Sequence, residues 1–455
     1  MFDEYNTRYY CVNLSTILKD KMNFTSKHTL DIFKDTFSPH NSKFNSSHTT
    51  LRKIFMSAII VFSAISIMGA RGCGNSGTDF PADQAKALQA SLDQSKADFG
   101  FPGGALAVRE VGGATWMGAT GIATFASNVA DVKGTSDKDF FPSFFVSTAW
   151  AGSSDFEMRT YLYTRIGSMT KSYTATLILK MVEEGLLRLE DTIDDWMGVG
   201  YYPNSDIITI RQLLNMTAGI TSYTGTGTFY ARYTADSTQE FLPEELVSYA
   251  RDSATPNNFA PGAGWNYSNT NFVILGLIAE KAGGSSFKEL ITTKIIEPLG
   301  LTDTSVPAGE NRAVPLEYIS GYKDDSGTWV DATLYSPTIA FSAGNMISTL
   351  PNMLQWIESI HEMKLLTEYS TIQMMDFVSM TTGGPLNGGT AGYGLGLSYH
   401  KGAIGHAGEI NGYKVIVNKY KNHYFAVIVN TDSAAGNAEE VFWRAARVLY
   451  PDDNI

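Results

Sequence analysis

The apolar positions of this chain follow a helical period in some segments and alternate as in strands in others. Residues 82–98 have the spacing of an amphipathic helix, and residues 104–111 and 114–119 alternate as the two strands of a hairpin. Residues 170–340 are mainly helix and loop, and from Tyr393 onward three or four strands precede a closing helix. This pattern predicts an α+β fold: one antiparallel sheet formed from both chain ends and flanked by helices, with an inserted, mainly helical subdomain.

Another apolar segment, close to the start of the chain, has a different character. It runs from residue 54 to residue 70, follows a basic pair, and is short for a membrane-spanning helix. A charged region followed by an apolar region is typical of a secretory signal. Cys73 follows a glycine, as at the acylation point of a bacterial lipoprotein signal, although Arg71 is unusual there. We therefore expect a signal peptide or lipoprotein signal over 51–73, with Cys73 as a candidate lipidation site; an uncleaved membrane anchor is the alternative.

The regions on either side of this signal differ in composition. Residues 1–50 are polar, rich in Asn, Ser, Thr and Lys, and show little periodicity. We expect them to be unstructured, or to lie upstream of a true start near Leu51. Residues 74–82 are a short linker, and residues 83–455 form the folded domain, of which 170–340 is the helical subdomain. The sequence thus predicts an exported protein, periplasmic or attached to the cell envelope.

Composition narrows the classes of function. The chain has 455 residues, of which 44% are hydrophobic, so it can bury a large core. Its net charge of −12 argues against a nucleic-acid partner. Both cysteines, Cys11 and Cys73, precede the folded domain, which therefore has neither a disulfide nor a cysteine nucleophile. The seven histidines are scattered, and no metal-binding or nucleotide-binding motif occurs, so we expect no cofactor and no metal.

The strongest chemical signal is a Ser-x-x-Lys stretch, Ser168 to Lys171, which opens a long helical pattern. Residues three apart stand on one face of a helix, so the lysine amine can reach the serine hydroxyl. A serine needs a base to take its proton during attack, and a helix N-terminus favours the anion that forms. Three other Ser-x-x-Lys stretches lie in an ordinary helix start, a turn and a strand, at 285–288, 320–323 and 398–401.

Two later stretches complete this pattern. A Tyr-Ser-Asn stretch at 267–269 follows Pro-Gly-x-x-Trp, and a His-Ala-Gly stretch lies at 406–408. Taken singly, each residue has a structural explanation: Tyr267 as an aromatic of the core, Asn269 as a helix N-cap, and His406 as a surface or structural histidine. Because all three motifs occur together in this order and context, we interpret them as one catalytic set.

In these motifs, from about residue 81 to the C-terminus, the chain resembles the serine β-lactamase and penicillin-binding-protein superfamily. It is most similar to the branch of class C β-lactamases, D-alanyl-D-alanine carboxypeptidases and related esterases. The resemblance implies the fold described above, with the active site in a cleft between the sheet and the helical subdomain. It implies Ser168 as the nucleophile that forms an acyl-enzyme. Lys171 and Tyr267 would share the proton transfers, one of them acting as the base in acylation.

The same resemblance implies the groups that bind the substrate. Asn269 would orient the amide carbonyl of the substrate. His406 takes the place of a lysine found in many relatives; it would lie on an edge strand and set the electrostatics around the scissile bond. The oxyanion hole would be formed by the backbone N–H groups of Ser168 and of Glu409, the residue that follows Gly408.

The chain departs from the resemblance at three places, of which the first two bear on the substrate. Residues 125–160 form an insertion before the nucleophile, which we expect to be a lid or wall of the cleft, or a plain surface excursion. No Lys or Arg occurs between Lys364 and Lys401, where carboxypeptidase relatives often supply a cation for the terminal carboxylate. Met216 takes the place of a histidine found in many relatives, a difference that we attribute to packing.

We therefore expect a serine hydrolase that forms an acyl-enzyme with a small peptide, ester or β-lactam, and that contacts the membrane only through its N-terminal signal or lipid anchor. The first choice of activity is that of a D-alanyl-D-alanine carboxypeptidase-like enzyme or a D-amino-acid peptidase on cell-wall-type peptides. An esterase on small acyl esters comes close behind, and a class C-like β-lactamase is third. A penicillin-binding sensor that does not turn over is the remaining alternative.

Overall fold

The computed structural model describes residues 80–126, 155–307, 313–315 and 317–455. The two predicted N-terminal segments, with Cys73, and most of the predicted insertion lie outside the described residues. Of the helices in the described part of the chain, none combines the length and the apolar character needed to cross a bilayer.

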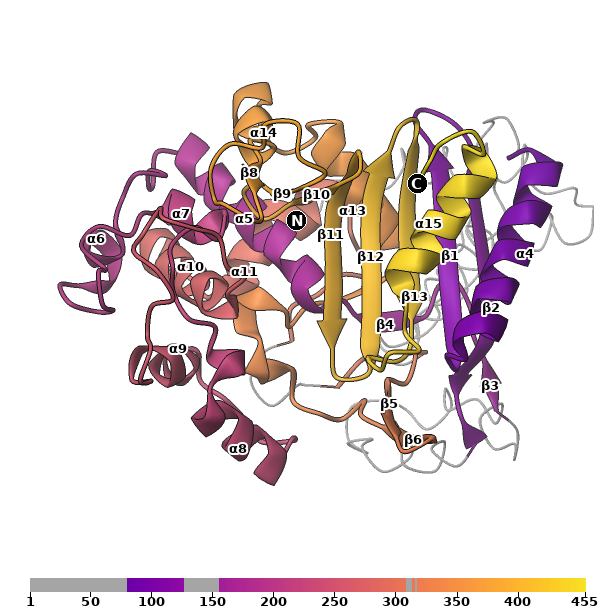
Figure 1. The fold of residues 1–455 in the computed structure, drawn as a ribbon, viewed down its shortest axis with the longest axis horizontal. Helices are drawn as coiled ribbons and strands as arrows, with labels where there is room; N and C mark the ends of the chain where they lie inside the picture. Colours follow the sequence, from indigo (N-terminus) through magenta and orange to yellow (C-terminus); the bar gives the residue numbers. More distant parts are fainter. Residues whose placement is uncertain (1–79, 127–154, 308–312, 316) are drawn as a thin grey trace, which may run out of the picture. The chain divides into compact units, whose positions relative to one another are not determined.

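A nine-stranded antiparallel sheet contains strands from both ends of the chain (Figure 1). The first and last long strands pair directly, with Gly104 opposite Val429 and Glu110 opposite His423. This pairing confirms the predicted sheet. The spatial order of the strands is β3 (Phe156–Glu157), β2 (Thr115–Thr124), β1 (Gly103–Glu110), β13 (His423–Val429), β12 (Tyr413–Tyr420), β11 (Ala403–Ile410), β10 (Ser398–His400), β9 (Ala391–Tyr393) and β8 (Val378–Ser379).

Two helices from opposite ends of the described chain cover one face of the sheet. α4 (Ala82–Phe99) and α15 (Ala438–Leu449) lie side by side on this face (Figure 1). Leu88 of α4 and Phe442 of α15 share one buried cluster with Phe425 of β13. Because burial of apolar surface contributes about 25 cal/mol per Å², this cluster stabilises the joining of the two chain ends.

The opposite face of the sheet packs against α13, and other helices lie beyond it. α13 (Leu350–His361) contacts the central strands β1, β12 and β13. α5 (Thr170–Glu183) is buried at every position from Thr170 to Leu179, and α10 (Asn269–Gly283) packs against it. A helix that is buried on all sides is a rigid support, and the candidate nucleophile lies at the start of α5.

The remaining helical elements are short. They are η4 (Gly167–Met169), α6 (Ile193–Met197), α7 (Ile210–Leu214), η5 (Tyr223–Gly225), α8 (Gly227–Ala235), α9 (Pro243–Arg251), α11 (Phe287–Ile291), the π-helical η6 (Thr292–Ile296), α12 (Glu297–Leu299), η7 (Pro337–Ile339), η8 (Phe341–Ala343) and α14 (Glu368–Met374). Two small antiparallel pairs complete the described structure: β4 (Tyr163–Arg165) with β7 (Ile347–Thr349), and β5 (Tyr322–Asp325) with β6 (Thr328–Asp331).

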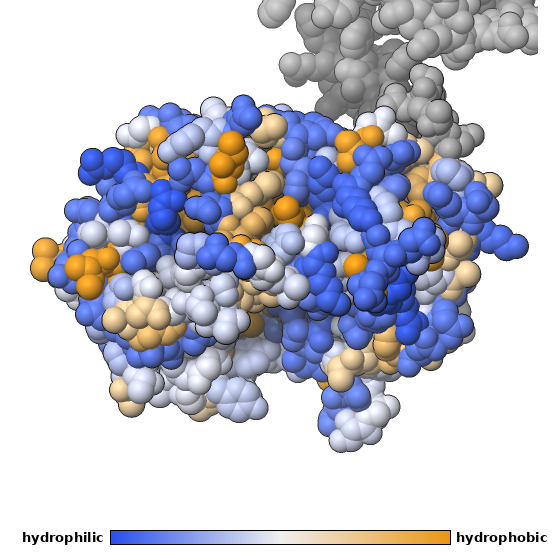
Figure 2. All heavy atoms as spheres, turned by 45° about the horizontal axis from the view of Figure 1, so that its top comes forward, coloured by the Kyte–Doolittle hydropathy of each residue, from blue (hydrophilic) through white to orange (hydrophobic). Residues whose placement is uncertain are grey.

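Hydrophilic residues cover most of the face shown in Figure 2, and apolar residues form small separate groups on it. Over the described chain as a whole, the large exposed apolar side chains are distributed over many elements, such as Tyr230 on α8 and Ile372 on α14. Scattered apolar exposure of this kind is usual and needs no bound partner to explain it.

Candidate active site

Ser168 lies at the junction between a 3₁₀ turn and a buried helix. It is the partly exposed residue of η4, which leads directly into α5. The preceding residue, Gly167, has a left-handed backbone with φ of 50°. A Cβ on Gly167 would lie 2.6 Å from the backbone N of Glu409. Both the conformation and this close approach require glycine.

The backbone of strand β11 lies in direct contact with the turn that carries Ser168. A Cβ on Gly408 would lie 1.9 Å from the carbonyl oxygen of Ile166 and 3.0 Å from the backbone N of Met169. Only glycine permits such an approach without moving one of the two backbones. The contact holds the strand against the turn that carries Ser168.

Glu409 contributes its backbone, not its side chain, to this contact. Its backbone N lies beside Gly167. An oxyanion hole at this position would need the N–H groups of Glu409 and Ser168 to point at the same oxygen. The side chain of Glu409 is 61% exposed and forms an ion pair of 3.5 Å with Lys414, the residue opposite it on β12. The carboxylate is therefore engaged on the surface of the sheet.

Lys171 is fully buried three residues after the serine. Its Nζ lies 3.0 Å from Ser168 Oγ, 2.7 Å from Asn269 Oδ1 and 2.7 Å from the carbonyl oxygen of Ala343. Burial holds the pKa of Lys171 well below its usual range. The amine can therefore be neutral at a pH where an exposed lysine is charged.

The three oxygen atoms around Nζ decide how a neutral amine is oriented. A neutral amine has two N–H groups and one lone pair. The oxygens of Asn269 and Ala343 can only accept hydrogen bonds, so they take the two N–H groups. The lone pair then faces Ser168 Oγ, in the position of a base that removes the serine proton.

Tyr267 also contacts the nucleophile. Its hydroxyl hydrogen-bonds to Ser168, and desolvation raises the pKa of this tyrosine. Lys171 Nζ lies 4.8 Å from the centre of the Tyr267 ring. A phenol with a raised pKa stays protonated at neutral pH, so it can relay a proton but is a poor base. Of the two groups, Lys171 has the environment of the base.

Asn269 is the first residue of α10, and Ser268 is the N-cap. Asn269 is therefore not itself the helix cap. Its Oδ1 accepts from Lys171, its Nδ2 lies 3.2 Å from Thr224 Oγ1, and its backbone N lies 3.1 Å from Ser222 Oγ. Ser222 and Thr224 were not predicted, because nothing in the local sequence marks them. Their contacts hold the side-chain amide of Asn269 with its oxygen toward Lys171.

His406 is buried and hydrogen-bonded at both ring nitrogens. Its Nε2 lies 2.9 Å from the hydroxyl of Tyr393, and its Nδ1 faces the carbonyl oxygen of Ala407. A carbonyl only accepts, so Nδ1 carries the proton and Tyr393 donates to Nε2. Burial, and then the charge of Lys171, lowers the pKa of His406 to about 3. His406 is therefore neutral and supplies no positive charge.

The expectation that His406 lies on an edge strand is wrong. Strand β11 has β12 on one side and β10, β9 and β8 on the other. Strand β10 is short, however, and pairs only with residues Ala403 to Gly405 of β11. The β10 ladder thus ends one residue before His406.

Tyr393 was missed in the sequence because it lies in a glycine-rich stretch typical of a strand. It ends β9, and its ring is 6.3 Å from that of Tyr267 at 90° and 5.9 Å from that of Trp265. Together with its bond to His406, these contacts join the second and third motifs. Such a connection between two strands that are not direct neighbours in the sheet has no local sequence signal.

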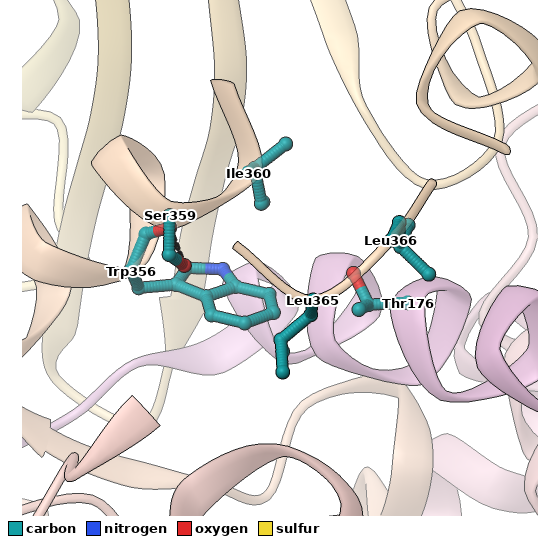
Figure 3. A pocket seen from close by; sticks show the side chains of 6 residues that line it. All are labelled: Thr176, Trp356, Ser359, Ile360, Leu365 and Leu366. Carbon is teal, nitrogen blue, oxygen red and sulfur yellow. Dashed lines mark hydrogen bonds between the residues drawn. The ribbon is translucent and has the colours of Figure 1, made fainter. Parts of the chain in front are cut away.

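Ser168 lines neither of two hollows in the described structure. Figure 3 shows a cavity of about 10 Å³ between α5 and α13, room for about one water molecule. A wider hollow of about 740 Å³ lies between the start of α8 and the end of α9 and is lined in part by Thr221, Thr226 and Asp252. The candidate site is recognised by the hydrogen bonds around Ser168 Oγ and Lys171 Nζ.

The structure brings most of the predicted site residues together. Side-chain contacts join Ser168, Lys171, Tyr267 and Asn269, while Gly408 and Glu409 reach the site through their backbones. His406 reaches it through Tyr393, which touches Tyr267. Within the described residues, His, Cys, Asp and Glu side chains form no group of three that could hold a metal ion.

Comparisons with known proteins agree with this geometry. The beta-lactamase family model matches residues 88–450. A penicillin-binding protein of Bacillus subtilis (strain 168) is 30% identical over 285 residues, which are 58% of this chain and 60% of that protein. The chain thus spans about three-fifths of that relative's length.

Solved structures show the same fold. A D-stereospecific amidohydrolase from Streptomyces sp. is 30% identical, with a TM-score of 0.65 over 79% of this chain and 97% of that one. A D-amino acid amidase from Ochrobactrum anthropi SV3 has a TM-score of 0.66 at 21% identity, over 82% of this chain and 99% of that one. The family match spans most of the chain and includes all three motifs. The protein therefore belongs to the beta-lactamase family and is a serine hydrolase.

Proposed function

We propose that the protein hydrolyses amides and short peptides of D-amino acids through an acyl-enzyme on Ser168. One observation carries the proposal: a buried amine of lowered pKa, Lys171 Nζ, lies 3.0 Å from Ser168 Oγ and is oriented by two carbonyl oxygens. A base in this position activates a serine hydroxyl for attack on a carbonyl carbon. The 30% identity to a D-stereospecific amidohydrolase supports the choice of D-amino-acid substrates.

In the acylation step, Ser168 Oγ attacks the substrate carbonyl and its proton passes to Lys171. The oxyanion that forms is stabilised by the N–H groups of Ser168 and Glu409. An amide nitrogen carries two N–H groups, so the second N–H of Asn269 Nδ2 remains for a carbonyl of the substrate. These contacts place the scissile carbonyl over Ser168.

Collapse of the tetrahedral intermediate breaks the bond to the leaving group. The leaving amine needs a proton, which Lys171 returns through the hydroxyl of Tyr267. In deacylation, water attacks the acyl-enzyme ester and gives one proton to Lys171 and Tyr267, which deliver a proton to Ser168 Oγ as the ester bond breaks. One proton thus moves between Lys171 and Tyr267 in both halves of the reaction.

The leaving-group side of the substrate is expected to carry no carboxylate. His406 is neutral, and residues 365–400 contain no Lys or Arg. Binding a carboxylate without a cation leaves its charge uncompensated. This favours simple amides and blocked peptides over the D-alanyl-D-alanine carboxypeptidase reaction. The same observation favours a second candidate, an esterase on small acyl esters.

A matched pair of substrates tests the proposal. We expect kcat/KM for D-alanyl-D-alanine amide to exceed that for D-alanyl-D-alanine by roughly tenfold or more, because only the second has a carboxylate. D-phenylalanine amide should be cleaved and L-phenylalanine amide much more slowly. Preference for the free dipeptide would favour the carboxypeptidase. Hydrolysis of p-nitrophenyl acetate alone would favour the esterase.

Export is a separate part of the proposal and rests on the sequence of residues 51–73. If Cys73 is lipidated, the protein will fractionate with membranes and incorporate labelled fatty acid, and Cys73→Ala will release it. Lipidation would be ruled out if the wild-type protein incorporated no fatty acid and fractionated in the same way as Cys73→Ala.

A further inference from the structure

Met216 adopts an unusual backbone conformation beside the catalytic segment. Its φ is 67°, in the left-handed region that residues other than Gly, Asn, Asp and His seldom adopt. Its side chain is fully buried. A conformation of this kind persists only where surrounding contacts stabilise it.

Those contacts are hydrogen bonds to the segment that carries Tyr267. The backbone N of Ser268 lies 3.4 Å from Met216 Sδ, and Asn271 Nδ2 lies 3.6 Å from the same sulfur. The backbone N of Asn266 donates to the carbonyl oxygen of Met216 at 3.1 Å. A thioether is a weak acceptor, but two donors converge on it here. Met216 thus contacts the segment at three points.

The position of these donors links Met216 to the catalytic groups. The N–H of Ser268 belongs to the peptide bond that follows Tyr267, and Ser268 caps the helix whose first residue is Asn269. Tyr267 hydrogen-bonds to Ser168, and Asn269 accepts from Lys171. A shift of this one peptide bond would therefore move both groups relative to the nucleophile.

We propose that Met216 is a positioning residue, whose sulfur accepts from the peptide between Tyr267 and Asn269 and holds both side chains against Ser168 and Lys171. The proposal rests on the proposed acyl-enzyme chemistry of Ser168. It replaces our attribution of Met216 to packing alone. The two interpretations differ in one respect: packing needs only the volume of the side chain, while positioning needs its acceptor.

Variants that separate volume from acceptor test this difference. Met216→Leu keeps the volume and removes the acceptor. Met353→Leu makes the same change at a fully buried methionine of α13 and serves as the matched control. Met216→His restores an acceptor nitrogen, and histidine tolerates the left-handed conformation. Each variant would be compared in kcat and KM for p-nitrophenyl acetate, in the rate of Ser168 labelling by a fluorophosphonate, and in Tm.

We expect Met216→Leu to lower kcat and the labelling rate roughly tenfold with little change in KM, since small misplacements of reacting groups cost rate rather than binding. Met353→Leu should keep the wild-type kcat, and Met216→His should recover most of it. Equal kcat in the two leucine variants, whatever their Tm, would overturn the proposal. If Met216→Leu does not fold, a folded Met216→His that loses tenfold in kcat would overturn it as well. Failure of the acyl-enzyme chemistry is distinguishable, because Ser168→Ala would then keep its activity.

Discussion

Replacing Gly408 by alanine is expected to separate β11 from the nucleophile turn. The added Cβ would lie 1.9 Å from the carbonyl oxygen of Ile166. Close carbon–oxygen contacts in proteins lie near 3.3 Å, so the two backbones would have to move apart by roughly 1.4 Å. The N–H of Glu409 moves with the strand and leaves the oxyanion. Loss of one such donor costs about 100- to 1,000-fold in kcat, or about 3 to 4 kcal/mol of transition-state stabilisation.

The assay is the hydrolysis of p-nitrophenyl acetate by Gly408→Ala, with Ser168→Ala as the blank. Gly384→Ala is the matched control, because its Cβ would lie 3.7 Å from its nearest neighbour, Thr382 Oγ1, an ordinary contact. Overpacking also costs about 1 to 3 kcal/mol of stability, so kcat is measured well below the Tm of each variant. A folded Gly408→Ala with the kcat of the Gly384→Ala control would refute the assignment of Glu409 to the oxyanion hole.

Three further predictions concern the proton transfers and the third motif. Because protonated Lys171 cannot act as a base, kcat/KM should rise with pH through the lowered pKa of Lys171; a pH–rate profile with no acid limb would contradict this. Tyr267→Phe should lower kcat about 100- to 10,000-fold while leaving the position of that limb unchanged, which the same profile measures. Tyr393→Phe leaves Nε2 of His406 without its donor and should lower kcat about tenfold. An unchanged kcat would show that the Tyr393–His406 bond has no part in positioning.

The parts of the site that the sequence predicted are those with a local geometric reason. Ser168 and Lys171 are three residues apart at the start of a helix, so their contact follows from helical spacing. The alternation of apolar residues predicted the strands, and their place at both chain ends predicted the joined sheet. In each case the relevant neighbours are close in sequence or share one period.

The parts that were missed depend on contacts between distant segments. The carbonyl oxygen of Ala343, which orients Lys171, lies 172 residues away in sequence. Tyr393, Thr224 and the sulfur of Met216 likewise reach the site only when separate elements pack together. The wrong expectation that His406 lies on an edge strand has the same origin. Strand β10 pairs with β11 on its outer side, but this pairing ends before His406. Spacing and composition do not carry such information.

Labelling with a fluorophosphonate tests whether Ser168 is a nucleophile activated by Lys171. Intact mass and peptide mapping would be compared for the wild type, Ser168→Ala and Lys171→Met. We expect one adduct per wild-type chain, located on Ser168, none in Ser168→Ala, and labelling slowed by at least about 100-fold in Lys171→Met. An adduct on another residue, or full labelling speed without Lys171, would contradict this expectation.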